Sequence, residues 1–174
     1  MRFNVYTNNL ILRILLAFLL TIFRQIFNTI FAPLTMFWSF YLFNIFVPGS
    51  VLEGVKLITP TNTFSFIPAC TAASAYLLLS LLILLTKDIS WENRLKMFIS
   101  GSLAILFFNL IRIEILLFFF YKLTNIYPLI HLFFWKFMST LYVVFVWIIL
   151  SKVYKVKSIP AYSDIKHLIR LIKK

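Results

Sequence analysis

Three side chains that suit acyl transfer lie on three separate apolar segments of the chain. Cys70 is the single cysteine, and it lies just inside the start of its apolar segment. Arg112 and His131 lie in two later apolar segments. A thiol, a guanidinium and an imidazole can serve as nucleophile, oxyanion stabiliser and acid–base group. This chemistry requires that the fold brings the three segments together.

Each of these residues also has a purely structural interpretation. A lone buried cysteine usually packs as a small hydrophobe, and a histidine at a membrane interface serves as a hydrated cap as readily as a base. Arg112 differs, because charge inside a membrane is costly and indicates function, although a long arginine can also extend to the interface. Asn109 lies one turn before Arg112 on the same helical face, where it supports the site or makes an interhelical hydrogen bond.

The composition is that of a membrane protein. The 174 residues are 62% hydrophobic, with 13% charged residues and a mean hydropathy of +0.96, whereas soluble domains are roughly half apolar. The net charge of +12 comes from basic residues near the ends of apolar segments. We therefore expect anionic lipid, and not nucleic acid, as the partner of this charge. We expect no metal and no cofactor, and one cysteine excludes an intramolecular disulfide.

The apolar segments predict an all-α integral membrane protein with about five transmembrane helices. The first segment, residues 10–31, either spans the membrane or lies in the interface with Arg13 and Arg24 on a polar stripe. Pro33 is expected to separate it from the next span. The other expected spans are residues 34–47, 66–85, 97–121 and 129–150.

The polar segments complete this organisation. Residues 49–65 are expected to form a polar loop, and residues 87–96 a short charged one. Residues 1–150 would be the transmembrane catalytic domain and residues 151–174 a basic cytoplasmic tail. Residues 161–174 predict a basic amphipathic helix that rests on an anionic membrane surface. Its apolar stripe consists of Ile165, Leu168, Ile169 and Ile172.

The positive-inside rule places the 87–96 loop and the tail in the cytoplasm. The segment that carries Arg112 then runs outward, and Arg112 lies about 22 Å along it at the helical rise. In a hydrocarbon core of about 30 Å, this places Arg112 about 8 Å below the outer surface. Cys70 comes to a similar depth, and His131 lies near the outer end of its own helix. The three side chains are thus expected at one level on the outer side.

These residues carry a resemblance to a known family. Ala69-Cys70-Thr71, Asn109-Leu110-Ile111-Arg112 and His131, each near the outer end of a separate predicted helix, resemble the exosortase/archaeosortase family over roughly residues 60–150. The chain is shorter than common bacterial members, and Thr71-Ala72-Ala73 lacks the glycine often found after the cysteine.

The resemblance implies a cysteine protease or transpeptidase of the cell (plasma) membrane whose site faces the extracytoplasmic side. Its substrates would be exported proteins that end in a short motif, a transmembrane helix and a basic cluster. Cys70 would be the nucleophile, Arg112 the oxyanion stabiliser and His131 the acid–base group. Water, a lipid or another amine would resolve the intermediate.

Two other classes of function fit the same sequence. A small binding subunit of a membrane transporter would use Arg112 and Lys136 to hold an anionic solute, and Cys70 would be dispensable. In a structural assembly factor, none of the three polar residues would matter beyond stability.

The predicted topology has a direct test in a Cys70→Ala background. A Lys157→Cys tail should stay unlabelled by a membrane-impermeant thiol reagent in intact cells, whereas a cysteine placed in the 49–65 loop should be labelled. The positive-inside rule is the physical reason for this difference. Labelling of the tail in intact cells would exclude the topology.

Overall fold

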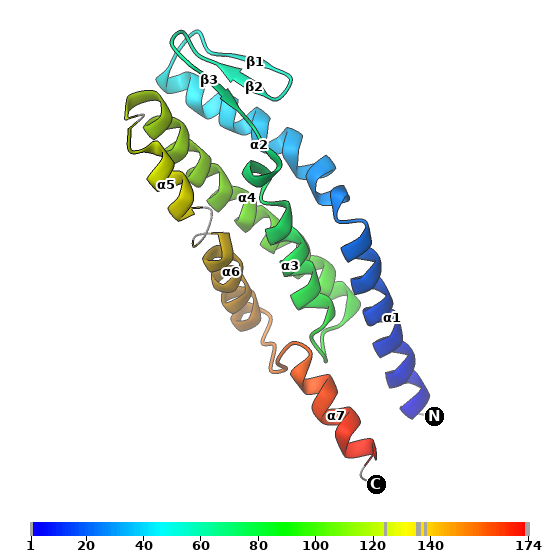
Figure 1. The fold of residues 1–174 in the computed structure, drawn as a ribbon. Coiled ribbons are helices and arrows are strands. Elements are labelled where there is room, and N and C mark those ends of the chain that lie inside the picture. Colours follow the sequence, from blue (N-terminus) through cyan, green and yellow to red (C-terminus); the bar gives the residue numbers. More distant parts are fainter. Residues whose placement is uncertain (1, 124, 135–136, 138, 173–174) are drawn as a thin grey trace.

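The computed structural model describes residues 2–123, 125–134, 137 and 139–172, and these are mostly α-helical (Figure 1). The helices are α1 (Arg2–Ile22), α2 (Gln25–Phe46), α3 (Ala73–Leu84), α4 (Trp91–Lys122), α5 (Tyr127–Phe133), α6 (Ser139–Val153) and α7 (Tyr162–Ile172). Between α2 and α3 lie strands β1 (Val51–Glu53), β2 (Lys56–Ile58) and β3 (Thr63–Ser65), and a 3₁₀ turn, η1 (Pro68–Thr71). The short helix α3 packs against α1, α2, α4 and α6.

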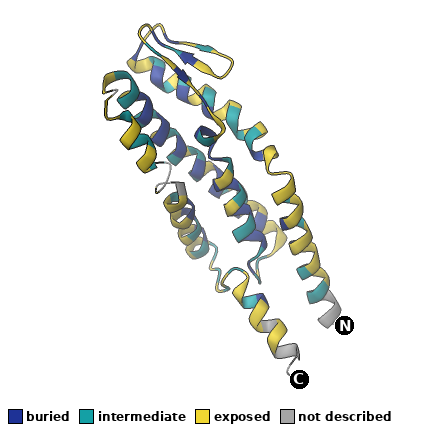
Figure 2. Cartoon of the chain, viewed as in Figure 1, coloured by how far each residue is buried: buried dark blue, intermediate teal, exposed yellow. Residues whose placement is uncertain are grey.

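Two of the described helices, α2 and α4, are long and apolar enough to cross a membrane. Helices α3 and α6 are also apolar but shorter, with 12 and 15 residues. Large apolar side chains such as Phe18, Phe37 and Leu103 are 56–63% exposed on the outer faces of the helices. Figure 2 shows this exposed outer surface around the buried facing sides of α3 and α4. Such a surface suits contact with lipid, and the arrangement of about five spans stays a prediction.

The boundary between the first two helices differs from the expected one. Helix α1 ends at Ile22 and α2 begins at Gln25, so the break precedes Pro33 and does not occur at it. Helix α2 continues through Pro33. A proline removes one backbone donor, but packing of α2 against α3 and α4 supports the helix on both sides. The prediction that Pro33 separates two helices was wrong.

Two other expected spans are interrupted. Within residues 66–85, regular helix begins only at Ala73, because Pro68 starts a 3₁₀ turn and Ala72 is left-handed, with φ of 53°. Residues 129–150 divide between α5 and α6, with π-helical geometry at Phe134 and Phe137.

The all-α prediction and the loop predicted at residues 49–65 are corrected by a small antiparallel sheet of order β1-β2-β3. Its register pairs Leu52 with Leu57, and Leu57 with Phe64. Leu57 and Phe64 are buried in a cluster with Phe43 of α2 and Cys70. Strands of three residues are too short for alternation to identify them in a sequence.

The larger core lies where α3 and α4 face each other. Tyr76, Leu79 and Ile105 are fully buried there. A Cβ atom added at Gly101 of α4 would lie 2.6 Å from Leu79 Cδ2 and 2.8 Å from Leu150 Cδ1. Glycine thus permits the close approach of α4 to α3 and α6, as small residues do between membrane helices.

A buried ion pair fastens α7 to the opposite end of the molecule from the sheet. Arg13 Nη2 lies 2.8 Å from Asp164 Oδ2, and the two side chains are 6% and 9% exposed. Arg13 Nη1 also donates to the Thr86 carbonyl at 3.0 Å, and the Tyr6 hydroxyl donates to Asp164 Oδ1 at 2.8 Å. Burial, and then the hydrogen bond to Asp164, raises the pKa of Tyr6 to about 12. Tyr6 therefore stays a neutral donor to the ion pair.

The amphipathic C-terminal helix is confirmed as α7 (Tyr162–Ile172), with exposed apolar side chains at Ile165, Leu168 and Ile169; residues 173–174 and the side chain of Ile172 lie outside the described part of the chain. Its one described acidic residue, Asp164, is the residue that faces inward to Arg13. The apolar stripe thus stays available to a membrane surface while Asp164 holds the helix.

The ion pair predicts a large effect of Asp164→Ala on stability. The substitution leaves the Arg13 guanidinium buried without a counter-charge, which should lower the free energy of unfolding by about 3 kcal/mol. Equilibrium unfolding in mixed dodecylmaltoside–SDS micelles measures this change. The control is Glu92→Ala, which removes the acid of the exposed Glu92–Lys96 pair and should have no measurable effect. Equal losses in the two variants would contradict the assignment.

Candidate functional site

Cys70 lies on the η1 turn, where the chain passes from the sheet into α3. Pro68 begins the turn, and the Cys70 N–H donates to the Ile67 carbonyl at 2.8 Å. Ala72 then takes the left-handed conformation, which costs an L-residue roughly 1–2 kcal/mol. Cys70 and Ala72 are buried, with 3% and 5% exposure. The thiol is therefore held in a tight, strained and enclosed turn.

Two side chains from consecutive turns of α4 hold this segment. Asn109 Nδ2 donates to the Cys70 carbonyl at 2.8 Å, and Arg112 Nη2 donates to the Ala69 carbonyl at 2.8 Å. Both side chains are buried. The Arg112 guanidinium is also close enough to the Cys70 thiol to interact with it electrostatically. The fold thus brings together Cys70, Asn109 and Arg112, three of the four residues predicted for the site.

The Nε donor of the Arg112 guanidinium differs from the Nη2 donor that bonds to Ala69. Arg112 Nε is buried and has no hydrogen-bond partner among the described residues. The Tyr142 hydroxyl on α6 is also buried, and the Arg112 guanidinium is the hydrogen-bonding group beside it. An unpaired buried donor is uncommon in folded proteins, and a carboxylate or an oxyanion would satisfy Arg112 Nε.

His131, the fourth predicted residue, lies on α5 and is half-buried. In the part of the chain that the structure describes, it makes no hydrogen bond to Cys70, Asn109 or Arg112. Its ring centroid is 5.7 Å from that of Tyr127, one turn earlier on the same helix. Tyr127 packs against the hydrophobic cluster that contains Cys70. Tyr127 therefore contacts both His131 and the cluster around Cys70.

Sequence reasoning missed both tyrosines. Tyr127 had a usable signal, because it precedes His131 by four residues and thus shares its helical face. Tyr142 had none, since only the packing of α6 against α4 places it beside Arg112. Lys136, considered above for an anionic solute, lies outside the described residues.

Helix α2 supports the turn from its other side, where the Thr71 hydroxyl donates to Asn28 Oδ1 at 2.7 Å. Across the described residues, no group of three His, Cys, Asp or Glu side chains could hold a metal ion. The groups that this site offers for chemistry are the Cys70 thiol, the fixed donors of Asn109 and Arg112, and the His131 imidazole.

No protein-family model, curated protein or solved structure matches this chain.

The hydrogen bond from Asn109 predicts that Asn109→Ala weakens both the fold and the protection of Cys70. The substitution leaves the buried Cys70 carbonyl unpaired and should cost about 1–3 kcal/mol of unfolding free energy. Because Cys70 is the sole cysteine, its rate of labelling by N-ethylmaleimide reports on this turn alone. Labelling should be faster in Asn109→Ala and unchanged in Asn125→Ala, a control at an exposed loop asparagine. Unchanged labelling in both variants would show that Asn109 does not hold the turn.

Proposed function

We propose that this protein is a multi-pass membrane cysteine transpeptidase or protease of the exosortase/archaeosortase type. The observation that carries the proposal is the contact between α4 and the Cys70 turn. A buried arginine donates a hydrogen bond to the carbonyl next to the sole cysteine, and its Nε has no hydrogen-bond partner among the described residues. Helix α4 also carries a second such arginine, Arg94, with an unpartnered Nε among the described residues. The nearby thiol is what distinguishes Arg112 from Arg94.

In the proposed reaction, the Cys70 thiolate attacks a peptide carbonyl just outside the transmembrane helix of the substrate. A carbon–sulfur bond forms, and the carbonyl electron pair moves to the oxygen, where Arg112 stabilises the charge. When the tetrahedral intermediate collapses, His131 donates a proton to the departing amine and a thioester remains. Water or an amine then attacks the thioester, His131 accepts its proton, and the Cys70 thiolate is released.

Tyr127 would orient the imidazole for both proton transfers. The Tyr127 ring lies beside the His131 ring, and Tyr127 also packs against the hydrophobic cluster that contains Cys70. The imidazole makes no hydrogen bond to the thiol within the described part of the free protein. Catalytic contacts often form only when substrate is bound, so substrate would complete the arrangement.

The proposed substrates are exported proteins whose C-terminus carries a short motif, a transmembrane helix and a basic cluster. Cleavage would occur on the outer side of the plasma membrane. With an amine acceptor, the product is a protein joined to a lipid or another anchor, and with water it is a released protein.

The second candidate is an anion-binding subunit of a membrane transporter. The observation in its favour is that Arg112 Nε is buried and unpaired within the described residues, so it could hold an anionic solute. This function does not use a nucleophile, and the two candidates therefore differ in their dependence on Cys70.

The enzyme proposal predicts that Cys70→Ser abolishes processing. A serine hydroxyl is far less ionised than a thiol, although the substitution keeps size and polarity nearly unchanged. The measurement is the ratio of uncleaved to mature substrate in cells that express each variant at matched level. The reporter is an exported protein of the same genome that ends in an apolar helix and a basic cluster.

Arg112→Lys should impair the same processing nearly as much, because lysine keeps the charge but loses the planar set of donors. Its matched control is Arg24→Lys, at an exposed position between α1 and α2, which should process normally. Normal processing by Cys70→Ser would exclude the cysteine enzyme and favour the transporter subunit.

A further inference from the structure

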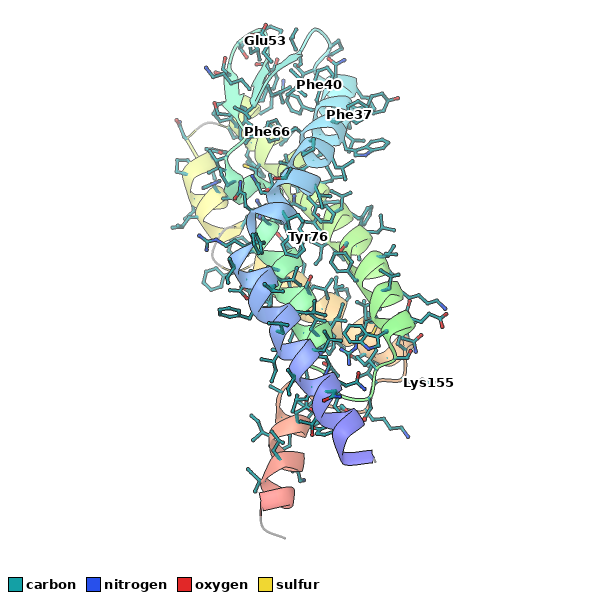
Figure 3. All side chains as sticks on the ribbon, turned by 90° about the vertical axis from the view of Figure 1, so that its right-hand side faces the viewer. Phe37, Phe40, Glu53, Phe66, Tyr76 and Lys155 are labelled. Carbon is teal, nitrogen blue, oxygen red and sulfur yellow. The ribbon has the colours of Figure 1, made fainter. Side chains whose placement is uncertain are left out.

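A basic hollow of about 480 Å³ lies at the C-terminal end of α6. Trp147 and Ser151 line it from the helix, and Lys152, Lys155 and Lys157 line it from the helix end and the segment that follows. Figure 3 shows Lys155 at the opposite end of the molecule from Glu53 in the sheet. The hollow is therefore far from the Cys70 turn and plays no part in the chemistry proposed above.

The backbone holds Lys155 in an unfavourable conformation. Helix α6 ends in a Schellman motif, in which the Val156 N–H donates to the Ser151 carbonyl at 2.8 Å and the Lys155 N–H to the Lys152 carbonyl at 3.2 Å. Lys155 occupies the left-handed position of this motif, with φ of 53°. Glycine is the usual residue there, because it adopts this conformation without a steric cost. The chain thus has a lysine where glycine would be more stable.

The three lysines around the hollow form no ion pair within the described residues, and an acidic side chain, Asp88, lines the adjoining pocket with Lys155 and Lys157 and accepts a hydrogen bond from Ser158. The ion pairs of the described residues are Arg13–Asp164 and Lys96–Glu92, so none of the three lysines pairs with a carboxylate in that part of the chain. Like charges repel, and an anion between them would relieve this repulsion. Ser151 also lines the hollow, but its hydroxyl oxygen is buried away from the surface.

The surroundings of the hollow are apolar on the side of the helix. Ile148 lines it beside Trp147, and large apolar side chains of α6 are exposed toward the outside. These side chains are Leu141, Val144, Phe145, Ile148 and Ile149. An indole below a group of lysines at a helix end is typical of the boundary between hydrocarbon and headgroups. A ligand that fills this site should therefore be anionic at one end and apolar at the other.

We propose that this hollow binds the phosphate headgroup of an anionic phospholipid, with the acyl chains lying along the exposed face of α6. The three lysines neutralise the phosphate, and Trp147 lies at the level of the glycerol backbone. This inference rests on the membrane placement proposed above, but not on the reaction at Cys70. The cytoplasmic leaflet, rich in anionic lipid, is the expected source.

The test uses the purified full-length chain in dodecylmaltoside and its melting temperature. Phosphatidylglycerol added to the micelles should raise this temperature in a saturable manner, and phosphatidylcholine should not. Inorganic phosphate at matched ionic strength should also have no effect, because it lacks the acyl chains.

The double variant Lys152→Gln/Lys157→Gln should lose about thirtyfold in apparent affinity for phosphatidylglycerol. Its matched control is Lys56→Gln/Lys122→Gln, which removes the same charge from exposed positions in β2 and at the end of α4, outside the hollow, and should bind as wild type does.

Lys155→Gly separates binding from folding. Glycine relieves the left-handed strain, so this variant should melt at or above the wild-type temperature without lipid. Its stabilisation by phosphatidylglycerol should nevertheless be smaller. Because its fold is not weakened, misfolding cannot account for that loss.

Three results would overturn the proposal. These are an equal loss of affinity in the control double variant, an equal stabilisation by phosphatidylcholine, or an equal stabilisation by inorganic phosphate alone. Cys70→Ser should bind phosphatidylglycerol as the wild type does, so a failure of the enzyme proposal leaves this test unaffected.

Discussion

The fold depends on hydrogen bonds that side chains of α4 donate to the chain segments at both ends of the short helix α3. At one end, the Arg94 guanidinium donates to the carbonyls of Ile83, Leu84 and Thr86. At the other, Asn109 and Arg112 donate to the Cys70 and Ala69 carbonyls of the η1 turn. In apolar surroundings an unpaired backbone carbonyl costs several kcal/mol. Arg94 thus pairs carbonyls of the last turn of α3, and Asn109 and Arg112 pair carbonyls of the turn that precedes this helix of 12 residues.

The same contacts give the Cys70 turn its position. Arg112 is needed to pair a backbone carbonyl, and this structural task explains its burial without any chemistry. Its Nε has no hydrogen-bond partner among the described residues, however, and the thiol lies within the electrostatic reach of the guanidinium. Arg112 can thus both support the backbone of the turn and take part in the proposed chemistry. The small sheet adds to this arrangement, because Leu57 and Phe64 close the cluster in which Cys70 is buried.

The two ends of the molecule differ in chemistry. The end with the sheet holds the strained Cys70 turn and the aromatic side chains around it (Figures 1 and 3). The other end holds the Arg13–Asp164 pair and the lysines that follow α6. Ser158 and Asp88 are hydrogen-bonded there, so the segment after α6 is joined to the loop between α3 and α4. This difference between the two ends would suit a membrane protein that carries out its reaction on one side of the membrane and contacts anionic lipid on the other.

The sequence by itself determined the features that depend on local geometry and composition. Helical periodicity placed Asn109 and Arg112 on one face, and hydropathy identified the long apolar helices and the amphipathic α7. The tertiary structure decided the interruptions and the distant partners. Regular α3 begins only after Cys70 because donors from α4 pair the carbonyls of the turn, and Arg13 finds Asp164 across 151 residues of sequence. Such pairings depend on how whole helices pack against one another, and a local sequence pattern does not contain this information.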